Sequence, residues 1–305
     1  MKIRFGRPDI SRYADRFDLP EAGQGLSVTF LGVSTLLVGD GTSAVMTDGF
    51  FSRPSLLAVV ARRIAPHHAR IDAALERAEV TSLDALVPVH THFDHAMDSA
   101  VVAARTGARL IAGSSAANVG RGGDLPDDRI VQVRTGEQVT CGAFTLTLVE
   151  SRHCPPDRYP GAINDPVVPP VTASAYRCGE AWSLLLEHTG GRSALIQGSA
   201  GFVPGILSGR SADVVYLGVG QLGLQDEDYI RTYWKETVEA VGARRVILIH
   251  WDDFFQPLSK PLRALPYLGD DLDRTMRVID RLATEQGVSL HFPTLWRRED
   301  PWSGL

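Results

Sequence analysis

The sequence predicts a layered α/β protein in which two β-sheets are flanked by helices within one domain, residues 1–305. Short runs of apolar and β-branched residues, typical of strands, occur in both halves of the chain. A few helical patterns lie between them in each half, and neither an internal repeat nor a low-complexity linker divides the chain. Hydrophobic residues make up 44% of the sequence and charged residues 22%, a balance that permits a sizeable core.

The first third of the chain is expected to form a lead-in, two strands and a broken helix. Residues 1–26 are polar and rich in turn residues. The segment 27–40, SVTFLGVSTLLVGD, predicts a strand or hairpin arm, and 44–51 predicts its partner. Residues 56–80 have a helical pattern, which Pro66 should end or kink.

Residues 83–107 predict a strand–loop–helix unit. An apolar strand runs into a polar cluster, and an Ala-rich helix closed by Gly107 follows. The polar cluster thus lies at the carboxyl end of the strand, the edge at which layered α/β folds usually build their sites.

The rest of the chain continues this mixture of strands and helices. Residues 154–172 contain PPDRYPGAINDPVVPP, which excludes helix and central strand. A long loop inside a compact domain is usually functional, so we expect an active-site loop here. Helices are expected at 227–241 and 271–286. Further strands are expected near 109–112, 129–134, 144–150, 173–178, 182–188, 193–198, 213–217, 245–249 and 288–292.

Charge and cysteine content narrow the function classes. The formal charge of −5 carries no clustered basic excess, so neither nucleic acid nor an anionic membrane is expected as a partner. The three cysteines, Cys141, Cys154 and Cys178, contain no CxxC pair, which excludes a disulfide framework and a cysteine zinc knuckle. Because no secretory or membrane-spanning segment is recognisable, we expect a cytoplasmic protein. The sequence carries no signal for an oligomeric state.

A cluster of histidines and one carboxylate follows the strand of the 83–107 unit, where residues 90–95 read HTHFDH. Such a cluster is costly to bury unless it binds something. Imidazole and carboxylate are ligands for zinc, and also for manganese or iron. His90 and His92 would leave a strand end on the same side, while Asp94 and His95 would begin the next helix. One turn would then serve two metals, or one metal and its base.

HTHFDH resembles the HxHxDH motif of the metallo-β-lactamase superfamily. The segments FLGVSTLLV and VMTDGFF resemble that family's opening strands, ESRHC supplies His153 where the family has its third histidine, and ILIHW supplies His250 where it has its last. The resemblance spans roughly residues 27–255. It implies a four-layer αββα sandwich, with Asp48 orienting the metal ligands from behind.

The resemblance also implies two ligand sets. One metal would be held by His90, His92 and His153, and a second by Asp94, His95 and His250. The family normally has a bridging aspartate in a segment like GDTG, but here Ser199 stands at that place, within LIQGSAGF. A neutral hydroxyl is a poor substitute for an anionic bridge, so the second metal is expected to be weaker, absent or held by another group.

The implied function is metal-dependent hydrolysis of a small-molecule ester, lactone, amide or phosphodiester. One or two Zn²⁺ ions are expected, with Mn²⁺ or Fe²⁺ as alternatives, and a metal-bound hydroxide would attack the substrate. Asp94 would orient the water, accept its proton or ligate the second metal. His250 would ligate that metal or hydrogen-bond the substrate.

Other interpretations remain open at this point. An iron-binding oxidoreductase and a non-catalytic ligand-binding protein would keep the same fold. A serine hydrolase would use Ser199, but its segment QGSAG lacks the first glycine of a nucleophile elbow. Arg158 and Tyr159 either contact an anionic or aromatic substrate or belong to a plain surface loop. His188 precedes a Thr-Gly-Gly turn and is expected to be exposed.

Overall fold

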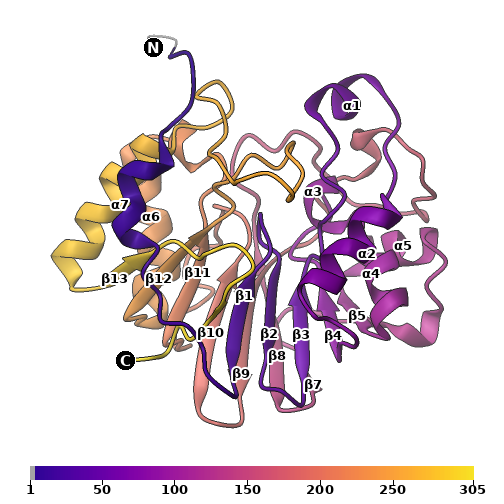
Figure 1. Ribbon diagram of the computed structural model, residues 1–305, viewed down its shortest axis with the longest axis horizontal. Helices are drawn as coiled ribbons and strands as arrows, with labels where there is room; N and C mark the ends of the chain where they lie inside the picture. Colours follow the sequence, from indigo (N-terminus) through magenta and orange to yellow (C-terminus); the bar gives the residue numbers. More distant parts are fainter. Residues whose placement is uncertain (1–3) are drawn as a thin grey trace.

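The computed structural model describes residues 4–305, so the first three residues of the predicted lead-in lie outside it. Two seven-stranded sheets lie face to face in the middle, and helices cover the outer face of each (Figure 1). The first sheet has the order β14-β1-β2-β3-β4-β5-β6. Its strands are β1 (Ser27–Phe30), β2 (Leu36–Gly39), β3 (Ala44–Thr47), β4 (Ala85–Val87), β5 (Arg109–Ala112), β6 (Ile130–Gln132) and β14 (Arg298–Glu299).

The second sheet has the order β13-β12-β11-β10-β9-β8-β7. Its strands are β7 (Gln138–Cys141), β8 (Phe144–Ser151), β9 (Ala181–His188), β10 (Arg192–Gln197), β11 (Val214–Gly218), β12 (Arg245–Ile249) and β13 (Ser289–His291). In this sheet β8 is antiparallel to β9 and β9 is antiparallel to β10, so β8 points in the same direction as β10. Strands β10, β11 and β12 are mutually parallel. The carboxyl ends of β8, β10, β11 and β12 therefore lie along one edge.

Helices from each half of the chain cover the sheet built from the same half (Figure 1). The first group comprises α1 (Leu56–Ala61), α2 (His68–Arg77), α3 (Phe93–Ala96), α4 (Ser99–Thr106) and α5 (Ser114–Gly122). The second comprises α6 (Glu227–Trp234), which continues as a π-helical turn over Lys235–Glu239, and α7 (Leu272–Gln286). Short 3-10 helices lie at Ile10–Arg16, Asp127–Arg129, Ala173–Ala175 and Leu222–Leu224. Within residues 4–305, none of the helices has the length and apolar character needed to cross a bilayer.

The alternation of side chains along the strands produces the layers. On β12, Val246 and Leu248 pack against the helices α6 and α7, whereas Ile247 and Ile249 pack against the other sheet. Successive strand residues point to opposite faces, so a fully apolar strand is buried on both. The same apolar run thus forms both the central core and one outer core.

Several predictions about individual elements need correction. The predicted strand at 173–178 is instead a 3-10 helix followed by a loop. Its backbone amides bond within turns, since Ala175 N donates to the Thr172 oxygen and Tyr176 N to the Ala173 oxygen. The preceding proline-rich segment supplies no continuous strand as a partner. His188 is also not exposed: its side chain is 14% accessible and its Nε2 lies 3.1 Å from Asp40 Oδ2.

Candidate metal centre

The predicted HTHFDH segment connects β4 to the short helix α3. His90 and His92 lie in the loop after the strand, and Asp94 and His95 lie in the helix. All four side chains are buried, with residue exposures of 7% or less. As the sequence predicts, the two histidines His90 and His92 follow a strand, and Asp94 and His95 lie in the helix that comes next.

His90, His92 and His153 form the first cluster. His90 Nε2 lies 3.2 Å from His92 Nδ1. The rings of His92 and His153 have centroids 4.6 Å apart. His153 reaches the cluster from the second sheet, because it follows the carboxyl end of β8. One donor atom from each of these residues lies within 4.8 Å of the others, a spacing that suits one ion.

Asp94, His95 and His250 form the second cluster, which meets the same spacing criterion. His95 Nε2 and His250 Nε2 are 3.1 Å apart, and Asp94 Oδ2 lies 3.6 Å and 3.5 Å from them respectively. His250 comes directly after β12, and its φ of 58° is unusual for a residue other than glycine. Such backbone strain is often stored at functional sites. The two clusters touch, because the ring centroids of His90 and His95 are 3.8 Å apart.

Asp48 holds the second cluster from behind. Its Oδ2 lies 2.9 Å from His95 Nδ1 and accepts a 2.6 Å hydrogen bond from Ser34 Oγ. Its Oδ1 accepts from the backbone N–H of Val89 at 2.8 Å, which ties the carboxylate to the loop that carries His90. A buried carboxylate bonded to the rear nitrogen of an imidazole is the arrangement that orients metal-binding histidines in proteins.

The electrostatics of the clusters favour a bound cation. Burial and the neighbouring His95 and His92 rings lower the pKa of His90 well below its usual value. Burial, together with His92, lowers the pKa of His153 to about 4. Burial alone would raise the pKa of Asp94, but the charge of His95 and the contact with His250 lower it. The low pKa values of His90 and His153 keep these two imidazoles neutral beside the Asp94 carboxylate, and neutral imidazole with carboxylate is a donor set of divalent metals.

Unpaired polar atoms test whether a metal would fit. Nδ1 of His90 and Nδ1 of His250 are both buried without a hydrogen-bond partner among residues 4–305. Four imidazole nitrogens face one another in two pairs, His90 Nε2 with His92 Nδ1 and His95 Nε2 with His250 Nε2, and at most one nitrogen of each pair carries a hydrogen. Buried polar groups left this way are costly unless an ion satisfies them. The residues present fit a metal ion.

Ser199 follows β10 and lines the same pocket as His92, Asp94, His153 and His250. It is 7% exposed, and its Oγ accepts a 3.0 Å hydrogen bond from the backbone N–H of Cys154. Nothing among the described residues pairs this hydroxyl with a histidine that would act as its base. Asp252, which the sequence left unplaced, is buried and accepts from the backbone N–H of Val33 while pairing with the guanidinium of Arg53.

Asp157 is a site residue that the sequence reasoning missed. It lies in the proline-rich loop, and its Oδ1 is 3.1 Å from His92 Nε2. Since His92 Nδ1 faces His90, the imidazole is held between the cluster on one side and this carboxylate on the other. Burial would raise the pKa of Asp157, but the hydrogen bond with His92 lowers it. The only available signal was the presence of an acidic residue in a loop already expected to lie near the site.

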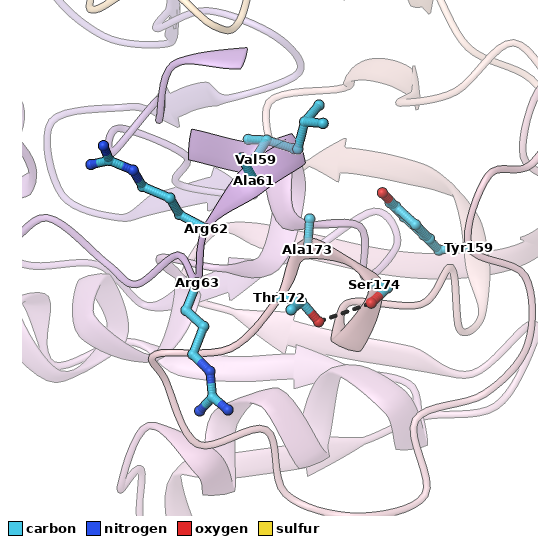
Figure 2. A pocket seen from close by; sticks show the side chains of 9 residues that line it. Val59, Ala61, Arg62, Arg63, Tyr159, Thr172, Ala173 and Ser174 are labelled. Carbon is cyan, nitrogen blue, oxygen red and sulfur yellow. Dashed lines mark hydrogen bonds between the residues drawn. The ribbon is translucent and has the colours of Figure 1, made fainter. Parts of the chain in front are cut away.

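Two pockets are lined by residues of the proline-rich loop and of helix α1. The larger, of about 700 Å³, contains His92, Asp94, His153 and His250 in its lining. The smaller, of about 370 Å³, lies between the end of α1 and residues 172–174 (Figure 2). Figure 2 shows Arg62 and Arg63 pointing away from the Tyr159 ring, and the lining of this hollow includes no histidine or carboxylate. The predicted metal ligands that reach a pocket therefore line the larger one.

No family model matches the chain, and no curated protein matches it in sequence. Solved structures do match over most of its length. Igni18, a metallo hydrolase from the archaeon Ignicoccus hospitalis, is 14% identical; the match covers 89% of this chain and 96% of that one, with a TM-score of 0.52. YhfI, a metallo-beta-lactamase fold protein from Bacillus subtilis, is 14% identical over 91% and 98% of the two chains, with a TM-score of 0.50.

A third similar structure carries a different activity in its name. CmlA, a diiron beta-hydroxylase from Streptomyces venezuelae, is 16% identical and has a TM-score of 0.54. The match covers 92% of this chain and 55% of that one. Together with the two helix-covered sheets, these likenesses confirm the predicted αββα sandwich: the chain has the metallo-β-lactamase fold.

Proposed function

We propose that the protein is a metal-dependent hydrolase of a small-molecule ester, lactone, amide or phosphodiester. One observation carries the proposal: two touching clusters of histidine and aspartate, drawn from both sheets, line a pocket of about 700 Å³. The name of the structurally similar Igni18, a metallo hydrolase, supports the same class of reaction.

In this proposal His90, His92 and His153 hold one ion tightly. Asp94, His95 and His250 would hold a second one weakly, because Ser199, in the same pocket, supplies no negative charge. When bound, a divalent ion supplies Lewis acidity and lowers the pKa of a water from about 15.7 to near 7.

The residues of the chain would do the remaining work of hydrolysis. The pKa of Asp94 is lowered and its side chain lines the pocket, so in the form that holds only the first ion it would orient the attacking water and accept its proton. His250 also lines the pocket, and its pKa is raised because the contact with Asp94 outweighs burial. In the form that holds only the first ion, His250 would donate a hydrogen bond to the substrate oxygen. An ester plus water would yield a carboxylic acid and an alcohol, with no other reactant.

The name of CmlA favours a second candidate, an iron-dependent oxidoreductase. That protein shares the fold and is named a diiron beta-hydroxylase. Zinc and iron accept the same imidazole and carboxylate ligands, so the clusters alone fit either metal. Protein purified with iron and a visible absorption band would favour this candidate over hydrolysis.

Metal content and inhibitor response test the proposal together. Elemental analysis of protein purified without chelator or affinity nickel should find about one tightly held zinc or manganese ion per chain. A chelator should abolish ester hydrolysis, and a serine-directed phosphonate should leave it unchanged. Phosphonate inhibition with chelator resistance would instead identify Ser199 as a nucleophile. A protein that takes up no metal even in excess zinc would contradict the proposal.

Replacing Asp157 with asparagine should weaken metal binding about 10- to 100-fold, the usual effect of removing a carboxylate behind a ligating histidine. The 3.1 Å contact with His92 Nε2 is the physical reason. Competition with a chromogenic chelator measures the affinity. Asp165→Asn changes an exposed aspartate of the same loop and should leave the affinity unchanged. Equal losses in both variants would refute the specific role of Asp157.

Replacing Ser199 with aspartate should raise the metal content from about one ion per chain toward two. The new carboxylate would stand beside both clusters and supply the anionic oxygen that serine lacks. Ser199→Asn, which has the same shape without the charge, is the matched control. Unchanged stoichiometry in Ser199→Asp, in a variant that still folds, would show that the missing carboxylate does not limit the second ion.

A further inference from the structure

The pocket that contains the clusters has mostly apolar walls. Helix α1 contributes one wall through Leu56, Leu57, Val59 and Val60. The segment after β12 contributes further aromatic and aliphatic side chains to the lining, which are Phe254, Phe255, Leu265, Pro266 and Leu268. Ligand sites combine apolar walls with a few convergent polar groups, and here the polar groups are the proposed metal ligands on one part of the lining.

Apolar side chains also reach solvent at the rim of this pocket. Leu57 is 67% exposed, Val60 is 77% exposed and Leu268 is 70% exposed, although all three line the cavity. Leaving large apolar groups in water is unfavourable, and a patch of them beside a cavity marks a binding surface. These side chains would be covered by whatever occupies the pocket.

The charges around the pocket fit a ligand with a polar end. Arg7 and Arg263 are already engaged, since both pair with Asp253. Arg158 lines the pocket, and its side chain forms no hydrogen bond or ion pair with the described residues, 4–305. A guanidinium in the same pocket lining as His92 and His153 would attract the carboxylate that an ester releases on hydrolysis.

We infer that the substrate is an amphipathic ester or lactone whose acyl part is an apolar chain. The chain lies between α1 and residues 254–268, and the scissile carbonyl lies at the histidine and aspartate clusters. This inference rests on the proposed function, which it makes specific. The pocket volume of about 700 Å³ lies in the range of sites that enclose a ligand of drug size, well beyond an acetyl group.

A series of p-nitrophenyl esters, from acetate to decanoate, tests the inference on the metal-loaded protein. The value of kcat/KM should rise by about fourfold for each added methylene until the pocket is filled, because each buried methylene contributes transfer free energy. The double variant Leu57→Ser/Leu268→Ser should flatten this dependence. Phe5→Ser removes an apolar side chain that is 83% exposed but lies outside the pocket lining, and it should keep the full dependence.

Direct binding separates the failure of this inference from that of the proposed function. Calorimetry on the purified protein should detect decanoate but not acetate, and the double variant should weaken decanoate binding at least tenfold. Ester hydrolysis with no dependence on chain length would overturn the inference and leave the hydrolase intact. Decanoate binding without hydrolysis of any ester would overturn the hydrolase and support an apolar ligand site. A double variant that behaves like Phe5→Ser would also overturn the inference.

Discussion

Replacing His92 with alanine should remove both the bound metal and the hydrolytic activity. His92 occupies the middle of the proposed site, since Nδ1 lies 3.2 Å from His90 Nε2 and Nε2 lies 3.1 Å from Asp157. Loss of a carboxylate behind a ligand costs about 10- to 100-fold in affinity or activity, so loss of the ligand itself should exceed 100-fold. Elemental analysis and kcat/KM for an ester measure the two effects on one preparation.

His68→Ala is the matched control for this experiment. His68 is an exposed histidine at the start of α2, and it belongs neither to the two clusters nor to the lining of their pocket. It should keep its metal content and its activity. A His92→Ala protein that retained both, with the circular dichroism of the parent, would show that the metal and the reaction lie elsewhere. Loss of metal with retained activity would separate the chemistry from the clusters.

Replacing Asp252 with alanine should lower the free energy of unfolding by about 3–5 kcal/mol, the cost of breaking a buried ion pair by removing one partner. Asp252 and Arg53 both have fully buried side chains, and Asp252 also accepts the backbone N–H of Val33 at 2.8 Å. In Arg53, Nε and Nη1 already lack a hydrogen-bond partner among the described residues. The variant would leave a buried cation with no counter-charge.

Urea unfolding monitored by circular dichroism measures this loss. Asp72→Ala removes one partner of the pair with Arg105, whose side chains are about half exposed and 2.9 Å apart. That surface pair should contribute less than about 1 kcal/mol. The backbone N–H of His250 donates a 2.6 Å hydrogen bond to the Val33 oxygen, so the buried pair also holds the Val33 loop beside His250. If Asp252→Ala were no less stable than Asp72→Ala, the buried pair would have no such role.

The sequence predicts the local part of the site well. HTHFDH lies within six residues, so its position after a strand and at the start of a helix follows from the pattern of its neighbours. His153 and His250 are distant in sequence, and the residues alone do not connect them to that motif. Only the family resemblance placed them, and the structure brings them to the same edge because β8 and β12 end there.

Long-range contacts, and segments without a periodic pattern, are poorly predicted from the sequence. Asp157 pairs with His92 across 65 positions, and no local spacing announces such a contact. Helix α5 was not predicted, because its sequence SSAANVGRG is rich in serine and glycine, which favour caps and turns. The segment 173–178 contains one residue of a type enriched in strands, Tyr176, and has no neighbouring strand to pair with, so it forms a 3-10 helix and a loop.

The proposed ligand set is divided between the two sheets, and this division has a consequence for folding. His90, His92, Asp94 and His95 belong to the half of the chain that builds the first sheet, while His153 and His250 follow strands of the second. In an unfolded chain, or in a chain with only one folded half, neither cluster is complete. An ion that binds only the assembled form stabilises that form by mass action. The availability of metal would then set the fraction of newly made chains in which the two halves are folded together. This effect would come in addition to the role of the metal in the reaction.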